Sequence, residues 1–253
     1  MLANFHTHTY RCKHATGEDK DYIEAAIQAG FQTLGFSDHC PWPFTDGYVS
    51  IIRMIPSEMD DYFSSIESLR KEYARDITIY AGFEAEYTPA LDEAQQKLFE
   101  EYPVDYLILG QHFLGLESES LYTGAPTTDE GVLKQYVDLV IEGMDTGRYL
   151  YLAHPDVINY IGPDSVYEKH MSRLCQYSKE KNIPLEINTL GLRDNRHYPC
   201  DKFLKIAGKI GNTVVLGMDA HAPEQLLRLD SVKQAERLCE KYNLNITEPV
   251  IQK

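Results

Sequence analysis

Seven of the nine histidines in the sequence follow short apolar runs, and two carboxylates occupy the same kind of position. Imidazole nitrogens combined with carboxylate oxygens suit zinc, iron or manganese. Nine such residues exceed the three or four protein ligands that one zinc ion takes, so the pattern predicts two or three divalent metal ions. The predicted ligands are His6, His8, His14, His39, Glu84, His112, His154, Asp219 and His221.

The spacing of these residues favours a shared site. Side chains two positions apart on a strand point to the same face, so His6 with His8, and Asp219 with His221, can reach one locus. By the same rule Glu86 shares a face with Glu84, and spacing alone leaves both open as ligands. Metal clusters of this size are typical of phosphate-ester hydrolysis, in which one ion activates water and another holds the phosphoryl oxygens.

The elements that must position these residues are short strands alternating with longer helical segments, which is typical of parallel strands joined by crossover helices. Each predicted strand is apolar and then ends in polar or ionisable residues. The predicted strands are Leu2–Thr7, Thr33–Ser37, Thr78–Glu84, Tyr106–Gln111, Tyr149–Ala153, Pro184–Asn188 and Thr213–Met218.

Helical periodicity fills the intervals between these strands, and Gly30 and Gly147 stand where left-handed C-terminal caps are expected. Seven strand-helix units, without an internal repeat or a linker, predict one α/β domain over residues 1–253 that forms a closed or nearly closed TIM-like barrel. An open doubly wound sheet is the alternative, but its usual glycine-rich phosphate loop is missing after the first strand. The predicted helices are Asp21–Ala29, Glu58–Arg75, Pro89–Glu101, Thr128–Thr146, Ser165–Lys181, Asp201–Lys209 and Pro223–Tyr242.

Active sites of such barrels lie at the carboxyl ends of the strands, so the loops there are candidates for substrate binding. Arg193 follows the sixth predicted strand, and a guanidinium suits bidentate contact with phosphate. His197 lies in the same loop and is the second predicted substrate contact. Asp38, which precedes His39, either orients a metal ligand or has a helix-capping or loop-closing role.

Two further residues near the predicted ligands are cysteines. Cys12 and Cys40 flank ligand positions, but free cysteine is more often a small buried hydrophobe than a metal ligand. The five cysteines include no C-x-x-C pair, which argues against a disulfide framework and a zinc ribbon.

Composition restricts the kinds of partner. The 253 residues are 43% hydrophobic and 25% charged, with a formal net charge of −15. This field repels nucleic acid, although bound cations can still attract a small anionic substrate into one cleft. The N-terminal MLANFHTHTYRCKH has no apolar signal core, and no apolar run reaches the roughly 18 residues of a membrane span, so we expect a cytoplasmic protein. Composition leaves the oligomeric state open.

The ordered segments HTHTYRCKH, FSDHCP, GFEAEY, GQHF, AHPD and GMDAH resemble the motifs of the polymerase and histidinol phosphatase (PHP) superfamily along the whole chain. The Cys-x-His loop and the chain length resemble its histidinol-phosphatase branch. This resemblance implies a distorted (β/α)7 TIM-like barrel with three metal ions. It places His6, His8, Glu84 and Asp219 on one ion, with Glu84 bridging to a second ion held by His112 and His154. The third ion would be held by His14, His39 and His221.

The resemblance also implies hydrolysis of L-histidinol phosphate to L-histidinol and phosphate, in histidine biosynthesis, with Asp219 and Glu84 as the catalytic carboxylates and Asp219 handling the proton. Two alternatives use the same residues. One is a PHP phosphoesterase acting on another small phosphomonoester or on a phosphodiester. The other is a noncatalytic metal-binding barrel, against which the open ligand set argues, because structural zinc sites are closed by four ligands.

Overall fold

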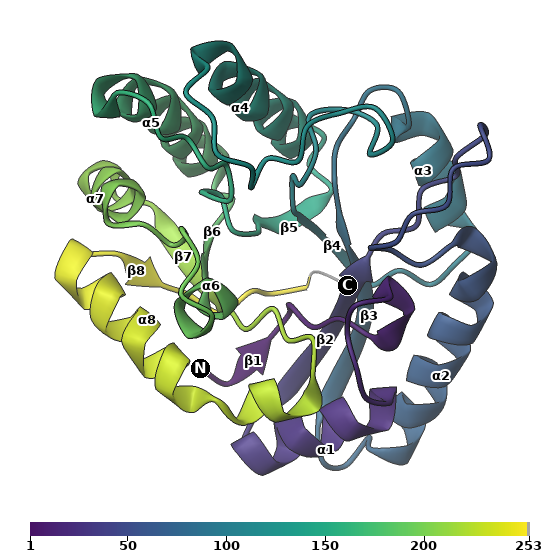
Figure 1. The fold of residues 1–253 in the computed structure, drawn as a ribbon. Helices are drawn as coiled ribbons and strands as arrows, with labels where there is room; N and C mark the ends of the chain where they lie inside the picture. The colour runs from purple at the N-terminus through teal and green to yellow at the C-terminus, as the bar shows by residue number, and fades with distance from the viewer. Residues whose placement is uncertain (252–253) are drawn as a thin grey trace.

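The computed structural model describes residues 1–251 as one α/β domain in which eight parallel strands follow one another in chain order around a distorted half-barrel (Figure 1). The longest strand pairing joins β2 and β3, which pair along seven residues. The strands are β1 (Ala3–Asn4), β2 (Thr33–His39), β3 (Thr78–Ala85), β4 (Tyr106–Leu109), β5 (Tyr149–Leu152), β6 (Leu185–Asn188), β7 (Thr213–Gly217) and β8 (Asn245–Ile246).

Helices lie on the outside of the curled sheet (Figure 1). They are amphipathic; α7, for example, buries Phe203, Leu204 and Ile206 and exposes Lys205 and Lys209. The helices are α1 (Asp19–Ala29), α2 (Met59–Glu72), α3 (Asp92–Glu100), α4 (Glu130–Asp145), α5 (Asp164–Lys181), α6 (Thr189–Arg193), α7 (Asp201–Ile210) and α8 (Leu229–Tyr242), with 3-10 turns η1 (Tyr10–Cys12), η2 (Pro56–Glu58) and η3 (Pro223–Leu227).

Strand alternation divides the core into two layers. On β4, Leu107 and Leu109 pack outward in the large core that faces the helices, whereas Tyr106 and Ile108 belong to a separate inner cluster. Phe5, Tyr151, Ala153 and Val215 complete that inner cluster. The interior of the half-barrel is therefore filled by side chains below the carboxyl ends of the strands, and those ends hold the predicted ligands.

The segments that follow β1 and β7 meet at the carboxyl ends of the strands. Thr7 and Ala220 form an isolated parallel bridge, in which the backbone N–H of His8 donates to Ala220 O at 2.9 Å. At the opposite end, β8 pairs with β7 instead. This arrangement explains why the barrel is distorted, and it brings the loops that carry His8 and His221 side by side.

Most predicted elements are present, with ends that coincide or are shifted by at most three residues. The predicted count of seven strands was wrong by the two-residue β8, which is too short to show a periodic pattern. The predicted helix Pro223–Tyr242 was also wrong in part, because Arg228 departs from helical geometry and separates η3 from α8. The segment before Arg193 forms the short helix α6, which was not predicted.

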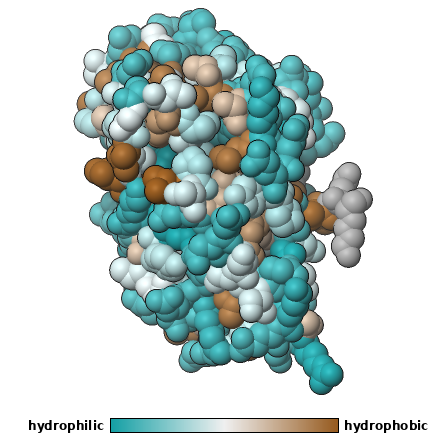
Figure 2. Space-filling view, turned by 90° about the vertical axis from the view of Figure 1, so that its right-hand side faces the viewer, coloured by the Kyte–Doolittle hydropathy of each residue, from teal (hydrophilic) through white to brown (hydrophobic). Residues whose placement is uncertain are grey.

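The two predicted glycine caps adopt the left-handed conformation, with φ of +88° at Gly30 and +70° at Gly147. None of the helices in residues 1–251 combines the length and the apolar character that crossing a membrane requires. On the face shown in Figure 2, hydrophilic residues predominate and hydrophobic ones form small separate groups.

Candidate metal centre

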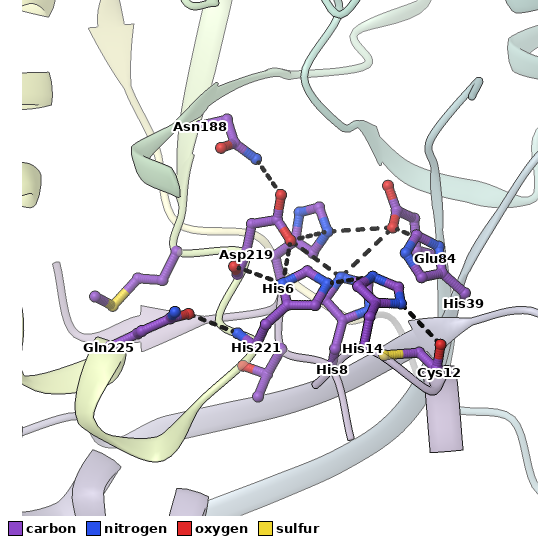
Figure 3. A network of polar contacts seen from close by, with 12 residues as sticks. His6, His8, Cys12, His14, His39, Glu84, Asn188, Asp219, His221 and Gln225 are labelled. Carbon is purple, nitrogen blue, oxygen red and sulfur yellow. Dashed lines mark hydrogen bonds and ion pairs between the residues drawn. The ribbon is translucent and has the colours of Figure 1, made fainter. Parts of the chain in front are cut away.

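The nine predicted ligands converge at the carboxyl ends of the strands, and seven of them are seen close together in Figure 3. They come from segments far apart in the chain, between residues 6 and 221. Two of them have unusual backbones: His154 has φ of +28° and Asp219 has φ of +48°. Non-glycine residues in this region are strained, and such strain is common where a side chain must be aimed at a functional site.

Glu84 is the hub of this cluster, with 1% of its side chain exposed. Gly110 leaves room for it, since a Cβ added to Gly110 would lie 2.0 Å from Glu84 Oε1. The carboxylate oxygens lie within 3.6 Å of five imidazole rings. These are His154 (2.6 Å), His39 (3.2 Å), His6 (3.4 Å), His112 (3.4 Å) and His8 (3.6 Å).

Among the described residues, five sets of three ligand atoms are compact enough to hold an ion, and two of them correspond to the predicted ion sites. His6, His8 and Asp219 offer atoms within 4.8 Å of one another, and Asp219 Oδ1 lies 3.1 Å from His8 Nε2. His14, His39 and His221 form a second set of the same size, in which His14 Nε2 lies 3.0 Å from His221 Nε2. His112 belongs to neither set and contacts Glu84 instead.

Many of these atoms are buried and have no hydrogen-bond partner within residues 1–251. They include His6 Nε2, His8 Nδ1 and Nε2, His39 Nδ1, Glu84 Oε2 and Asp219 Oδ1. Buried polar atoms in folded proteins are nearly always hydrogen bonded, so unpartnered atoms gathered at one place need an explanation. Divalent cations would provide one, because every one of these atoms is a metal-ligand atom. The residues therefore fit a centre of several metal ions.

The charge states of five of the ligands suit metal binding. Burial disfavours ionisation of Glu84 and Asp219, but the surrounding imidazoles outweigh it and hold the pKa of both carboxyls well below their usual range. Burial and the neighbouring His8 lower the pKa of His14, His39 and His221. Carboxylate and neutral imidazole are the forms that bind metal. Burial lowers the pKa of His6, His8 and His112, but the neighbouring carboxylates outweigh it and raise the pKa of these three rings, which must lose a proton when a metal binds.

The structure shows what surrounds Glu86 and Asp38, the two carboxylates whose role the sequence left open. Both oxygens of Glu86 accept hydrogen bonds from Arg53 at 2.9 Å, and Oε1 lies 3.2 Å from His112 Nδ1, behind the ring. Asp38 accepts a hydrogen bond from the backbone N–H of Thr9 and lies 3.5 Å from His8 Nδ1. Both carboxylates thus lie behind histidine rings, where they can orient them.

The two flanking cysteines differ in their surroundings. Cys12 lies with His8 and His221 in a further group of possible ligand atoms within 4.8 Å of one another. Cys40 belongs to the outer core and accepts a hydrogen bond from Gln95 at 3.2 Å. Burial raises the pKa of both thiols. Cys12 is therefore adjacent to the candidate centre, and Cys40 packs as a core residue.

A cavity of about 450 Å³ opens onto the cluster, and the predicted contacts Arg193 and His197 do not line it. The Arg193 side chain is 5% exposed, and its Nη2 donates to Gln225 Oε1 at 3.2 Å. His197 lies 2.7 Å from Val157 O and faces a different pocket. The position of neither side chain supports the predicted contact with substrate.

Arg196 lines the cavity instead, together with Asp194, Tyr122 and Tyr198. Arg196 Nη1 donates to the hydroxyl of Tyr198 at 3.2 Å, which directs the guanidinium along the cavity wall. Sequence reasoning missed Arg196 although it lies in the same loop as Arg193. The presence of two arginines three positions apart could have indicated that both are candidates for contact with the substrate.

Comparison with known proteins places this geometry in a family. The PHP domain family matches residues 4–190, which include seven of the nine predicted ligands. The chain belongs to the PHP domain family. Asp219 and His221 lie beyond the matched segment of this PHP domain.

The PHP domain is similar along its length to named phosphatases. The "Probable histidinol-phosphatase" of Deinococcus radiodurans is 29% identical over 234 residues, covering 89% of this chain and 88% of that protein. The "Histidinol-phosphatase" of Bacillus subtilis is 27% identical, covering 85% and 92%. The crystal structure of histidinol phosphate phosphatase from Lactococcus lactis, solved with zinc, L-histidinol and phosphate, superposes with a TM-score of 0.74 at 19% identity, covering 99% and 97% of the two chains. At that identity the superposition shows the shared fold.

Asp156, two residues beyond His154 in the PHP domain, should make stability depend on pH. It is 2% exposed, and burial raises the pKa of its carboxyl to about 6, while the N–H of Cys200 donates to it at 2.7 Å. The unfolded chain titrates near pH 4, so the folded state holds the proton longer and loses stability as pH rises from about 4 to 6.

Asp156→Asn removes this ionisation. The free energy of unfolding of the variant, relative to wild type, should therefore increase by about 1 kcal/mol when the pH is raised from 5 to 8. Urea unfolding of both proteins at the two pH values measures the difference. A wild-type-to-variant difference that is the same at both pH values would contradict the raised pKa.

Proposed function

We propose that this PHP domain hydrolyses L-histidinol phosphate to L-histidinol and phosphate, using two or three divalent metal ions bound by the nine residues of the cluster. The observation that carries the phosphatase proposal is the set of buried, unpartnered ligand atoms beneath an open cavity. A structural metal site would be closed by its ligands, whereas this cluster faces a space large enough for a small ester.

Bound divalent ions would supply an activated water and neutralise the phosphoryl oxygens. The chain itself contributes a fixed array of ligands around Glu84, so little reorganisation is needed when charge develops. Asp219 is the proposed proton acceptor, since it lines the cavity and Asn188 holds its Oδ2 with a hydrogen bond of 3.1 Å (Figure 3). The low pKa of Asp219 keeps its carboxylate ionised at neutral pH.

The walls of the cavity match the chemistry of histidinol phosphate. Arg196 offers a guanidinium to the phosphate. Asp194, whose Oδ2 lies 3.9 Å from Arg196 Nη2, offers a carboxylate to the amine, which the substrate carries on the carbon next to its phosphate-bearing CH2 group. Phe113 and Tyr122, whose ring centroids are 5.9 Å apart, supply flat apolar surface for the imidazole. The similarity to the two histidinol-phosphatases supports the same substrate.

The test is phosphate release from L-histidinol phosphate beside other monoesters and one diester, with protein loaded with zinc, manganese or iron. We expect kcat/KM for histidinol phosphate to exceed that of the others at least about a hundredfold, or roughly 2.7 kcal/mol of discrimination. High activity on another ester would retain the phosphatase chemistry but overturn the substrate. No turnover on any ester by metal-loaded protein would favour a noncatalytic barrel.

Arg196→Ala should raise KM for the phosphoester about tenfold or more, because it removes a charge-assisted contact with phosphate, while metal content stays unchanged. Arg193→Ala is the matched variant, since Arg193 lies in the same loop but contacts Gln225. Steady-state kinetics of both variants separate the two arginines. A larger rise in KM for Arg193→Ala than for Arg196→Ala would restore Arg193 as the phosphate contact.

A further inference from the structure

One buried carboxylate at the base of the cluster belongs to none of the predicted ligand sets. Glu186 lies on β6 with its side chain fully buried. Its hydrogen-bond partners are nitrogen atoms of the chain: it lies 2.7 Å from His6 Nδ1 and accepts from the backbone N–H of His154 at 2.9 Å and from Asn188 Nδ2 at 3.0 Å. Burying a carboxylate away from water is costly unless it is hydrogen bonded, so the buried Glu186 needs these contacts.

The contact with His6 determines which ring nitrogen is free. Because Nδ1 faces a carboxylate, it carries the hydrogen, and Nε2 keeps its lone pair. That Nε2 has no hydrogen-bond partner and points to the cluster, 3.4 Å from Glu84 and 3.5 Å from Asp219. Glu186 thus fixes both the tautomer and the direction of the His6 ring.

The other oxygen of Glu186 holds the backbone of a second ligand. His154 has a left-handed φ of +28°, a conformation that a non-glycine residue keeps only when its surroundings impose it. The hydrogen bond from His154 N to Glu186 fixes that turn, which places His154 Nε2 2.6 Å from Glu84 Oε1. Asn188 extends the same network to a third ligand, because it donates to both Glu186 and Asp219.

The neighbouring strand is adapted to this carboxylate. A Cβ added to Gly217, on β7, would lie 1.7 Å from Glu186 Oε1. Any side chain larger than glycine at that position would displace the carboxylate from His6. The space left by Gly217 accommodates the Glu186 carboxylate, and the three donors hold it in place.

We infer that Glu186 is the positioning residue of the metal centre, which sets the His6 ring, the His154 turn and, through Asn188, Asp219 for metal binding. This inference rests on the proposed metal-dependent function. It assigns Glu186 no contact with substrate, since Glu186 does not line the cavity.

The experiment compares Glu186→Gln with wild type by zinc titration against a competing chelator, followed by kcat and KM at saturating zinc. Glutamine keeps the shape but offers an amide NH2 where Glu186 accepts N–H groups, so we expect zinc affinity to fall about 10- to 100-fold. KM should change little, and kcat should recover in part at high zinc. Glu186→Asp, which keeps the charge, should bind zinc with intermediate affinity. Glu168→Gln, an exposed glutamate with the same loss of charge, is the control.

Gly217→Ala provides the second test, because it displaces Glu186 without altering any ligand, and it should also weaken zinc binding at least about tenfold. Folded Glu186→Gln or Gly217→Ala protein with zinc affinity within twofold of wild type would overturn the inference. Absence of turnover in the wild type would refute the proposed function alone, since the zinc titration still tests Glu186. An active wild type with unchanged zinc affinity in the variants would refute only the role of Glu186.

Discussion

Replacing Glu84 with glutamine is expected to lower kcat/KM for the phosphoester at least about a thousandfold and to reduce the bound metal. Glu84 is buried and lies within 3.6 Å of five imidazoles, so every proposed ion is next to it or one ligand away. Losing its charge removes metal-derived stabilisation of several kcal/mol from the transition state. Metal analysis and steady-state kinetics on the same sample measure both effects.

Glu93→Gln is the matched control, since this glutamate is 84% exposed on α3 and pairs only with Lys97. It should keep wild-type metal content and turnover. A Glu84→Gln protein that retains its full metal content and full turnover would show that Glu84 is not the hub of the centre.

The second large effect concerns stability: Arg53→Met should lower the free energy of unfolding by about 3–5 kcal/mol. Arg53 is 1% exposed and pairs with two buried carboxylates, Glu86 at 2.9 Å and Glu117 at 2.6 Å. It also stacks on Trp42, with its guanidinium carbon 4.5 Å from the ring centroid. Removing the cation leaves two buried negative charges without a partner.

The pKa of Glu86 makes the loss depend on pH. Burial disfavours its ionisation, but Arg53 and His112 lower its pKa to about 2, so the pairing stabilises the fold above about pH 4. Without Arg53 the Glu86 carboxyl prefers to be protonated. The loss of unfolding free energy in Arg53→Met should therefore be larger at pH 8 than at pH 5.

Urea unfolding of Arg53→Met and of Arg228→Met tests this expectation. Arg228 forms an exposed pair with Asp230, so a much smaller loss is expected for Arg228→Met than for Arg53→Met. Equal losses in the two variants would mean that the buried network contributes no more than a surface pair.

The same network has a structural role at the cavity. Glu117 also accepts hydrogen bonds from Tyr48 and Ser50, so it joins the loop after β2 to the loop after β4. Ile52 and Phe113, which line the cavity, lie in these two loops. Arg53→Met should therefore loosen the cavity wall as well as the core.

The ligand cluster could be predicted from sequence because the relevant signal is local. A strand alternates its side chains and the carboxyl ends of parallel strands share one edge, so His6, His8, Glu84 and Asp219 were expected to converge. Their convergence in the structure follows from the same rule. Three ions, their assignment to particular ligands and the substrate remain proposals.

The sequence by itself therefore determined the parallel α/β architecture, the approximate strands and helices, and the residue types capable of binding metal. Tertiary structure alone decided what supports and surrounds them: Glu186 behind His6, Arg53 between two glutamates, and Arg196 rather than Arg193 on the cavity wall. These relations join residues more than 30 positions apart or depend on which way a loop turns. Periodicity reports only which face of its own element a residue occupies, so such pairings arise only when the elements pack together.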